Sequence, residues 1–227
     1  MGPDEITARL RERFAVDARS EALLFQFVEL VETAKLNITA WTGDVLWTRG
    51  VMESLDLRTL LPNKVHGRGL DIGSGGGFPG MILAIAYPEW SWTLMDSRMR
   101  RCQFLTEAAA HLNLSNVLVV NARAEDWIKQ NMVYRDHFDV VTMRAVAPKL
   151  PSLELGLPYA RIGGVMLLAQ GVDGKADDAD SVALIKRLGG QTVQTVKHTE
   201  GRQTICLHKV ANTPSRYPRS GKALGRI

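Results

Sequence analysis

The sequence predicts an α/β protein built on a mostly parallel, doubly wound sheet of seven strands. Three observations carry this prediction. An apolar strand runs into the glycine-rich turn 70–80 and then into an apolar helix. Strand and helix patterns alternate from residue 69 to residue 188, and two further strand patterns close the chain. Alternating strands and helices give parallel strands, and two adjacent closing strands give an antiparallel edge.

Composition indicates one folded domain with an appendage. The chain has 227 residues, 45% hydrophobic and 23% charged, which is ordinary for a globular protein. The net charge of +4 and the pI of about 9.2 indicate an anionic partner. Cys102 and Cys206 form neither a disulfide framework nor a metal-ligand spacing, so we expect no metal. With no membrane-length apolar run and no signal-peptide core, we expect a cytoplasmic protein that contacts no membrane.

The N-terminal part predicts a helical extension over residues 1–62. Apolar residues recur at helical spacing in 20–36, and Thr42 is a candidate N-cap for the next helix. Pro62 ends the region. Trp41 and Trp47 are interpreted as packing residues, with stacking on a substrate as the alternative for either one. The expected helices are 5–14, 20–36 and 43–56.

The central part, residues 63–210, predicts the sheet domain. The residue before each turn and the apolar spacing within each segment set the bounds. Residues 211–227 form a basic tail. The expected strands are 69–73, 91–96, 117–121, 138–143, 164–169, 191–198 and 202–209. The expected helices are 79–87, 98–112, 124–131, 152–160 and 177–188.

The glycine-rich turn fits two cofactor codes. Gly75, Gly77 and Gly80 spell the dinucleotide fingerprint G-x-G-x-x-G. Asp71 with Gly73, Gly75 and Gly77 spells D-x-G-x-G-x-G, which resembles the first motif of S-adenosylmethionine (SAM) methyltransferases. An acidic side chain suits a cationic cofactor better than an anionic pyrophosphate, so charge favours SAM. An NAD-dependent oxidoreductase remains the less favoured alternative, because nothing after residue 150 leaves room for a second domain.

Ligands of such sheets bind beyond the carboxyl ends of the strands. Asp96 ends the second strand, where a carboxylate accepts both hydroxyls of a ribose; the alternative is a helix cap or a surface carboxylate. Arg123, Ala124 and Glu125 follow the third strand, at the turn that lies beside the adenine in methyltransferases. Glu125 is equally well read as a helix first-turn charge.

The turn after the fourth strand narrows the chemistry. Residues 142–147 lack the Asn/Asp-Pro-Pro-aromatic pattern of enzymes that methylate exocyclic amines. Neither cysteine is placed to attack a cytosine carbon. What remains is an acceptor with a free lone pair and no proton to remove, such as guanine N7, for which positioning supplies most of the rate. Arg144 is placed to bond the guanine O6 or the cofactor carboxylate, and a surface ion pair is its alternative.

These motifs resemble the bacterial 16S ribosomal RNA guanine-N7 methyltransferase family (RsmG, also called GidB). The resemblance implies a class I, Rossmann-like SAM-dependent fold and methylation of N7 of one guanine in small-subunit rRNA. From their chemistry we expect Arg144, at the guanine O6 or the cofactor carboxylate, and Arg123, among the cations that hold RNA, to be the catalytic residues. The matching segments are 36–39, Arg49 with 54–55, 71–80, 93–97, 123–125, 138–141, 144–145 and 217–219. Together with the motif reading, it gives this cofactor set: Asp71, Gly73, Ser74, Gly75, Gly77, Phe78, Asp96, Ser97, Arg98, Ala124, Glu125 and Arg144.

The chain departs from the family at three positions. The family usually has His where this chain has Gly50, and Ser or Thr where it has Met143. It usually has Lys where this chain has Gln170. Another RNA target, a small-molecule substrate or lost catalysis therefore remain alternatives. The tail cations Arg216, Arg219, Lys222 and Arg226 favour RNA and are expected to order on binding it. We expect a monomer acting on small-subunit RNA or the 30S particle.

Overall fold

The computed structural model describes residues 1–34, 38–171, 178–198 and 201–225. Its strands form one seven-stranded sheet in the order β3-β2-β1-β4-β5-β7-β6, parallel except that β7 runs antiparallel to β5 and β6. This confirms the predicted fold class. The strands are β1 (Arg68–Ile72), β2 (Ser91–Asp96), β3 (Val117–Asn121), β4 (Phe138–Arg144), β5 (Ala160–Gln170), β6 (Gly190–Lys197) and β7 (Gln203–Lys209).

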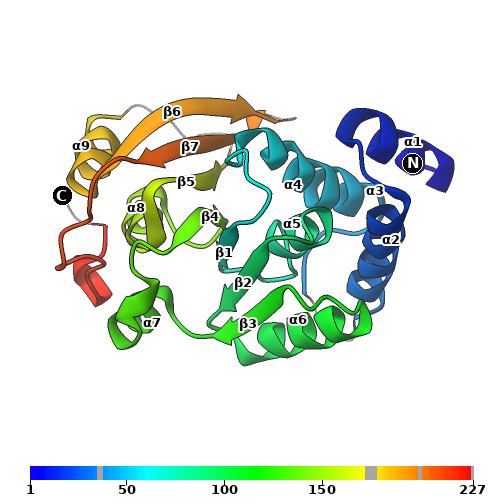
Figure 1. Cartoon of the computed structure of the whole chain (residues 1–227), viewed down its shortest axis with the longest axis horizontal. Helices are drawn as coiled ribbons and strands as arrows, with labels where there is room; N and C mark the ends of the chain where they lie inside the picture. The colour runs from blue at the N-terminus through cyan, green and yellow to red at the C-terminus, as the bar shows by residue number, and fades with distance from the viewer. Residues whose placement is uncertain (35–37, 172–177, 199–200, 226–227) are drawn as a thin grey trace.

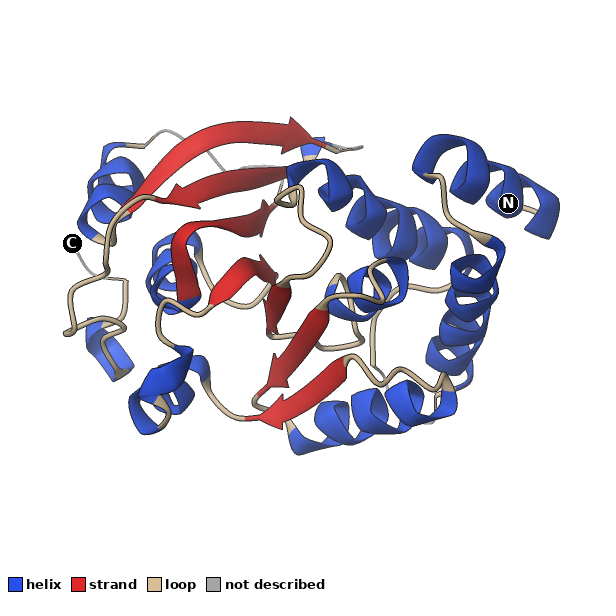
Figure 2. Cartoon of the chain, in the orientation of Figure 1, coloured by secondary structure: helices blue, strands red, loops and turns tan. Residues whose placement is uncertain are grey.

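Helices cover both faces of the sheet, the N-terminal ones and α5 and α6 on one side and α7, α8 and α9 on the other (Figures 1 and 2). Short helical turns continue several of them. The α-helices are α1 (Pro3–Phe14), α2 (Ala18–Thr33), α3 (Gly43–Val45), α4 (Glu53–Asp56), α5 (Gly80–Ala86), α6 (Met99–His111), α7 (Ala124–Gln130), α8 (Lys149–Gly156) and α9 (Ala179–Arg187). The other turns are η1 (Leu46–Met52), η2 (Leu57–Leu60), η3 (Met132–Tyr134), η4 (Leu157–Tyr159) and η6 (Gly221–Ala223).

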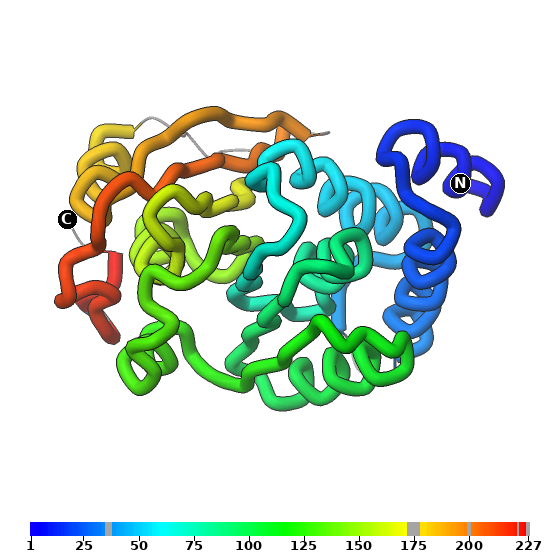
Figure 3. Tube along the Cα trace, in the orientation of Figure 1, coloured from blue at the N-terminus to red at the C-terminus, as the bar shows by residue number. Residues whose placement is uncertain are grey.

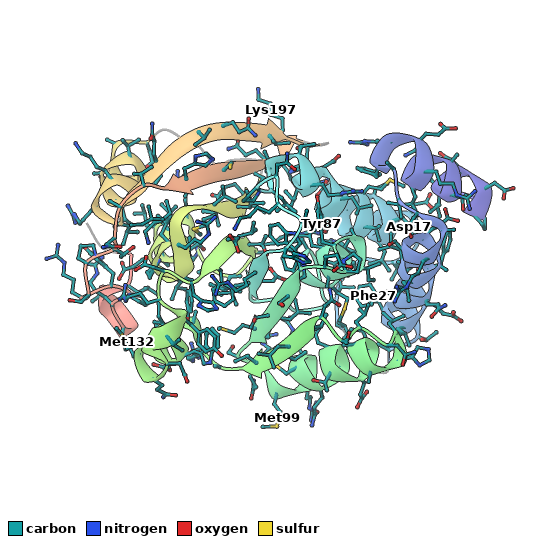
Figure 4. The ribbon with its side chains drawn as sticks, viewed as in Figure 1. Asp17, Phe27, Tyr87, Met99, Met132 and Lys197 are labelled. Atoms are coloured by element: carbon teal, nitrogen blue, oxygen red, sulfur yellow. The ribbon has the colours of Figure 1, made fainter. Side chains whose placement is uncertain are left out.

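The N-terminal helices share their core with α5 and α6. Phe27 of α2 is fully buried and lies against Phe78, with the ring centroids 5.5 Å apart. Figure 4 shows Phe27 directed from α2 into the molecule, whereas Met99 projects from the outside of α6. Leu94 of β2 and Leu105 of α6 belong to the same cluster. This cluster fixes the helical segments against the glycine-rich turn.

The C-terminal segment packs on the opposite face. The trace of residues 211–225 runs along the end of the molecule that carries α7, α8 and α9 (Figure 3). Tyr217 is buried in the second core cluster, and Arg219 donates to the buried carboxylate of Glu154 from Nε at 3.0 Å and Nη2 at 2.7 Å. The described part of the tail, residues 211–225, is therefore docked on α8 through Glu154.

Most elements differ from their predicted bounds by one to three residues, and three regions differ in kind or by more. Residues 43–60 form α3, the π-helical turn η1, α4 and η2 instead of one helix over 43–56. β5 begins at Ala160 rather than 164, because Gly163 and Gly164 lie inside the strand at an irregularity of its pairing with β4. α8 ends at Gly156 because the chain turns through η4 into β5. Residues 35–37, 177, 200 and 226–227, which the predictions also used, lie outside the described residues.

Candidate cofactor and acceptor site

The glycine-rich turn crosses from β1 to α5 in a backbone shape that side chains disfavour. Gly73, Gly75 and Gly77 have φ angles of +73°, +55° and +91°, in the left-handed region that glycine adopts freely. Close packing requires glycine at position 80, because a Cβ there would lie 2.3 Å from Leu94 Cδ2. The sequence thus brings α5 tightly onto β1 and β2.

Asp71 points into the protein and ties this turn to β4. Its Oδ1 accepts from Thr142 Oγ1 at 2.7 Å, and its Oδ2 accepts from the backbone N–H of Gly80 at 3.1 Å. Burial raises the pKa of Asp71 to about 6, although the Thr142 hydrogen bond opposes this shift. Asp71 therefore holds the first turn of α5 and faces no described cavity.

Asp96 lies at the carboxyl end of β2, where its carboxylate is buried but lines a cavity. Oδ1 accepts from the backbone N–H of Arg98 at 2.8 Å and Oδ2 from that of Gly75 at 3.0 Å. Arg101 Nη1 lies 3.4 Å from Oδ2. A carboxylate offers about four lone-pair sites; the two backbone donors and the longer Arg101 contact occupy three of them, so one site stays open to a ribose hydroxyl.

We call this the strand-end cavity. It holds about 780 Å³ of space that protein atoms do not fill, part of it open to solvent. Arg123 is mostly exposed and lies 3.8 Å from Glu125, whose side chain is largely buried. The cavity is lined by Ile72, Gly73, Met95, Asp96, Ser97, Arg98, Arg101, Ala122, Arg123, Ala124, Glu125, Ala145, Val146 and Leu155.

A second cavity lies at the carboxyl ends of β4 and β5, and we call it the Arg144 cavity. Ala145 lines both cavities, so they adjoin at this residue. Its lining is Trp41, Glu53, Leu57, Pro79, Thr142, Met143, Arg144, Ala145, Leu167, Ala169, Gln170, Gly171, His198, Arg202, Gln203 and Thr204.

Arg144 is held in place by its neighbours. Nη2 donates to the backbone carbonyl of Arg49 at 2.7 Å, and Cζ lies 4.3 Å from the centroid of the Trp41 ring. Burial lowers the pKa of Arg144 to about 10, while the nearby carboxylates of Glu53 and Asp71 act in the opposite direction. The guanidinium therefore stays charged at neutral pH. A charged guanidinium that lines the cavity suits an anionic or carbonyl group entering it.

The predicted site residues fall into three groups. Seven share the strand-end cavity: Gly73, Asp96, Ser97, Arg98, Arg123, Ala124 and Glu125. Arg144 lies in the adjoining cavity. The remaining five line neither cavity and form or support the glycine-rich turn: Asp71, Ser74, Gly75, Gly77 and Phe78.

Sequence reasoning missed Glu53, His198, Arg202 and Thr204, which line the Arg144 cavity. The only signal for Glu53 was an isolated acid among the apolar residues Val51, Met52 and Leu55. No sequence pattern singled out Arg202, because the sequence does not show that the strand after it lies beside β5.

Two of the three departures from the family pattern line the Arg144 cavity. Gly50 is buried, and a Cβ at this position would lie 3.0 Å from Phe78 Cε1. Met143 and Gln170 both line the Arg144 cavity, and Gln170 pairs in register with Gln203 of β7. Met143 and Gln170 therefore alter the Arg144 cavity, and none of the three positions lines the strand-end cavity.

Two further searches covered the same described residues. None of their helices is long and apolar enough to cross a membrane. They contain no group of three or more His, Cys, Asp or Glu side chains arranged to hold a metal ion.

Comparison with known sequences gives consistent matches over most of the chain. A family model described as rRNA small subunit methyltransferase G (GidB) matches residues 21–206. A protein of that name from Oenococcus oeni is 33% identical over 228 residues, covering 96% of this chain and 94% of its own. Its namesake from Roseiflexus castenholzii is 38% identical over 191 residues, covering 82% of this chain and 81% of its own.

Solved structures resemble this one in fold. MtNAS, as a mutant in complex with S-adenosylmethionine, gives a TM-score of 0.58 at 16% identity and covers 84% of this chain and 73% of its own. TYW2 from M. jannaschii in complex with AdoMet gives a TM-score of 0.54 at 14% identity, with 74% and 80% covered. At such low identity these likenesses establish only the class I methyltransferase fold.

Proposed function

Since the chain belongs to the rRNA small subunit methyltransferase G family, we propose that it methylates N7 of a guanine in small-subunit ribosomal RNA, with SAM as methyl donor. The observation that carries this proposal is the pair of adjoining cavities, one lined by Asp96 and the other by Arg144. The fold and the family are those of SAM-dependent methyltransferases.

The strand-end cavity suits the nucleoside part of SAM. The buried Asp96 carboxylate would accept the ribose hydroxyls, and Ala124 with Glu125 would lie beside the adenine. Gly73 would meet the amino-acid part, and Ser97 and Arg98 would close the rim. Asp71, Ser74, Gly75, Gly77 and Phe78 would support that loop from below.

SAM supplies a methyl group carried on a positively charged sulfur. Guanine N7 has a free lone pair and no proton, so the protein needs no general base and acts by positioning. Arg144, fixed by Arg49 and Trp41, would bind the guanine O6 or the cofactor carboxylate. Arg123, exposed at the cavity rim, would contact the RNA close to the target base.

The alternatives have weaker support. The family match disfavours an NAD-dependent oxidoreductase. Gly50, Met143 and Gln170 are the observations that favour another RNA target. We propose that the protein works in the cytoplasm as a monomer, on small-subunit RNA or the 30S particle.

The test is methyl transfer from labelled SAM to small subunits that lack the modification. Strand scission specific for N7-methylguanine then locates the product. We expect one labelled guanine with the wild-type chain and a strongly reduced yield with Arg144→Ala. Intact binding of S-adenosylhomocysteine without any transfer to small-subunit RNA would show that the substrate lies elsewhere.

A further inference from the structure

The Arg144 cavity contains an ion pair between residues distant in sequence. Arg202 Nη2 donates to Glu53 Oε1 at 2.6 Å, and the side chains are only 19% and 12% exposed. Glu53 begins α4, whereas Arg202 immediately precedes β7. Desolvating two charges costs about as much as their attraction returns, so stability is a weak reason for such a pair. Its position in the cavity points to ligand recognition instead.

A local irregularity of the chain turns Glu53 into this cavity. The π-helical turn η1 ends at Met52, and the backbone N–H of Glu53 donates to the carbonyl of Thr48 five residues earlier. Such widened turns recur at functional sites. Val51 and Met52 before Glu53 and Leu55 after it are buried in the core, while Glu53 lines the cavity.

We infer that Glu53 recognises the Watson–Crick edge of the target guanine, an inference that rests on the proposed function. Arg202 occupies Oε1, and within the described part of the chain Oε2 accepts no hydrogen bond. Guanine presents the N1–H and N2–H donors on this edge, which match a carboxylate acceptor. Adenine presents the N1 lone pair there, which repels a carboxylate. The arrangement therefore selects guanine partly by rejecting adenine.

Recognition on this edge leaves the reacting atom accessible. N7 lies on the opposite side of the purine from N1 and N2. A guanine held by Glu53 thus keeps its N7 lone pair for the methyl group. Arg144 lines the same cavity and remains available to bond O6.

The reaction strengthens the contact with Glu53. The N7 lone pair forms the new N–C bond, the methyl–sulfur bond breaks, and its electron pair returns to sulfur. The positive charge moves from sulfur to the guanine ring, and no proton is transferred. A ring that gains positive charge holds N1–H less tightly, so the hydrogen bond to a carboxylate becomes stronger in the transition state. Interactions that strengthen in this way raise kcat.

The test compares Glu53→Gln with Glu53→Asp and Arg202→Met. Gln retains the size of Glu but loses its charge, Asp retains the charge, and Arg202→Met breaks the same ion pair without removing the carboxylate. With undermodified small subunits, we expect Glu53→Gln to lower kcat at least about tenfold, with partial recovery in Glu53→Asp. The affinity for S-adenosylhomocysteine should not change, because Glu53 does not line the strand-end cavity.

A binding measurement removes the dependence on turnover. With S-adenosylhomocysteine bound, we expect NMR titrations of the wild type to give tighter binding of 7-methyl-GMP than of GMP, and of GMP than of AMP. This order should persist in Arg202→Met and disappear in Glu53→Gln. Thermal unfolding midpoints identify any variant that fails to fold, in which case Glu53→Asp alone decides.

The outcomes separate the two proposals. If Glu53→Gln keeps the wild-type kcat and nucleotide order, or if it matches Arg202→Met in every measurement, Glu53 is only an ion-pair partner and the inference is overturned. If the wild type transfers no methyl group to small subunits, the proposed function fails, and the nucleotide order still decides the role of Glu53.

Discussion

Asp96 holds the glycine-rich loop and is the proposed ligand of the cofactor ribose. Replacing it with Ala removes the acceptor of the Gly75 N–H and the proposed acceptor of the ribose hydroxyls. Hydrogen bonds to charged groups contribute about 1.5–3 kcal/mol each. We therefore expect Asp96→Ala to weaken S-adenosylhomocysteine binding at least about tenfold in calorimetry. Asp126→Ala, which removes an exposed carboxylate from α7, is the matched control; equal affinity in both variants would exclude Asp96 from the site.

The raised pKa of Asp71 makes the free energy of unfolding depend on pH. Because its folded pKa of about 6 lies above its ordinary value, the folded state holds the proton more tightly than the unfolded state. The free energy of unfolding therefore loses a contribution as pH rises from about 4 to about 6, and the loss is complete above that range. Urea unfolding should show this decline relative to Asp71→Asn, by about 1–3 kcal/mol. A difference between the two proteins that stays constant with pH would contradict it.

At the scale of elements, a buried carboxylate makes several of the contacts that hold the docked tail. Glu154 of α8 accepts from the side chain of Arg219 and from the backbone N–H groups of Arg219 and Gly225. Removing one partner of a buried pair costs about 3 kcal/mol or more. We expect Glu154→Gln to lower the free energy of unfolding accordingly and to expose the tail to limited proteolysis.

Arg216→Met is the control for this effect. Arg216 is exposed and lies over the Tyr217 ring at 5.1 Å. Such a contact contributes about 1 kcal/mol or less at the surface. A similar loss of stability in both variants would mean that the Glu154 contacts do not hold the tail.

Most elements could be predicted because their patterns are local. Strands 91–96 and 117–121 match β2 and β3 in full, since apolar periodicity and the following turn set both ends. The π-helical turn η1 could not be foreseen, because local propensity does not distinguish it from an α-helix. The same applies to β5, where Gly163 and Gly164 read as a turn but form an irregularity within the strand.

The site was partly predictable for the same reason. Asp96 and Gly73 belong to contiguous motifs, and the strand-end cavity brings them together. Glu53 and Arg202 are 149 positions apart, and only the packing of α4 beside the start of β7 joins them. Sequence spacing carries no information about such a pair.

At the scale of the whole molecule, the net charge of +4 should make RNA binding sensitive to salt. Arg100 of α6 and Arg123 at the strand-end cavity are both exposed. If each contacts a phosphate, Met at either position should reduce the slope of log K against log salt by about 1 in filter binding to small subunits. Arg9→Met on α1 is the control; equal slopes in all variants would remove Arg100 and Arg123 from the interface.

The shared core of the N-terminal helices has a consequence for biosynthesis. Leu10, Phe14 and Leu24 leave the ribosome before α5 and α6, which supply the other half of their cluster, have been translated. Until those helices emerge, the apolar sides of α1 and α2 remain exposed to solvent. The growing polypeptide is therefore most prone to self-association, or to capture by a holding chaperone, while its first third is complete and its second third is still being made.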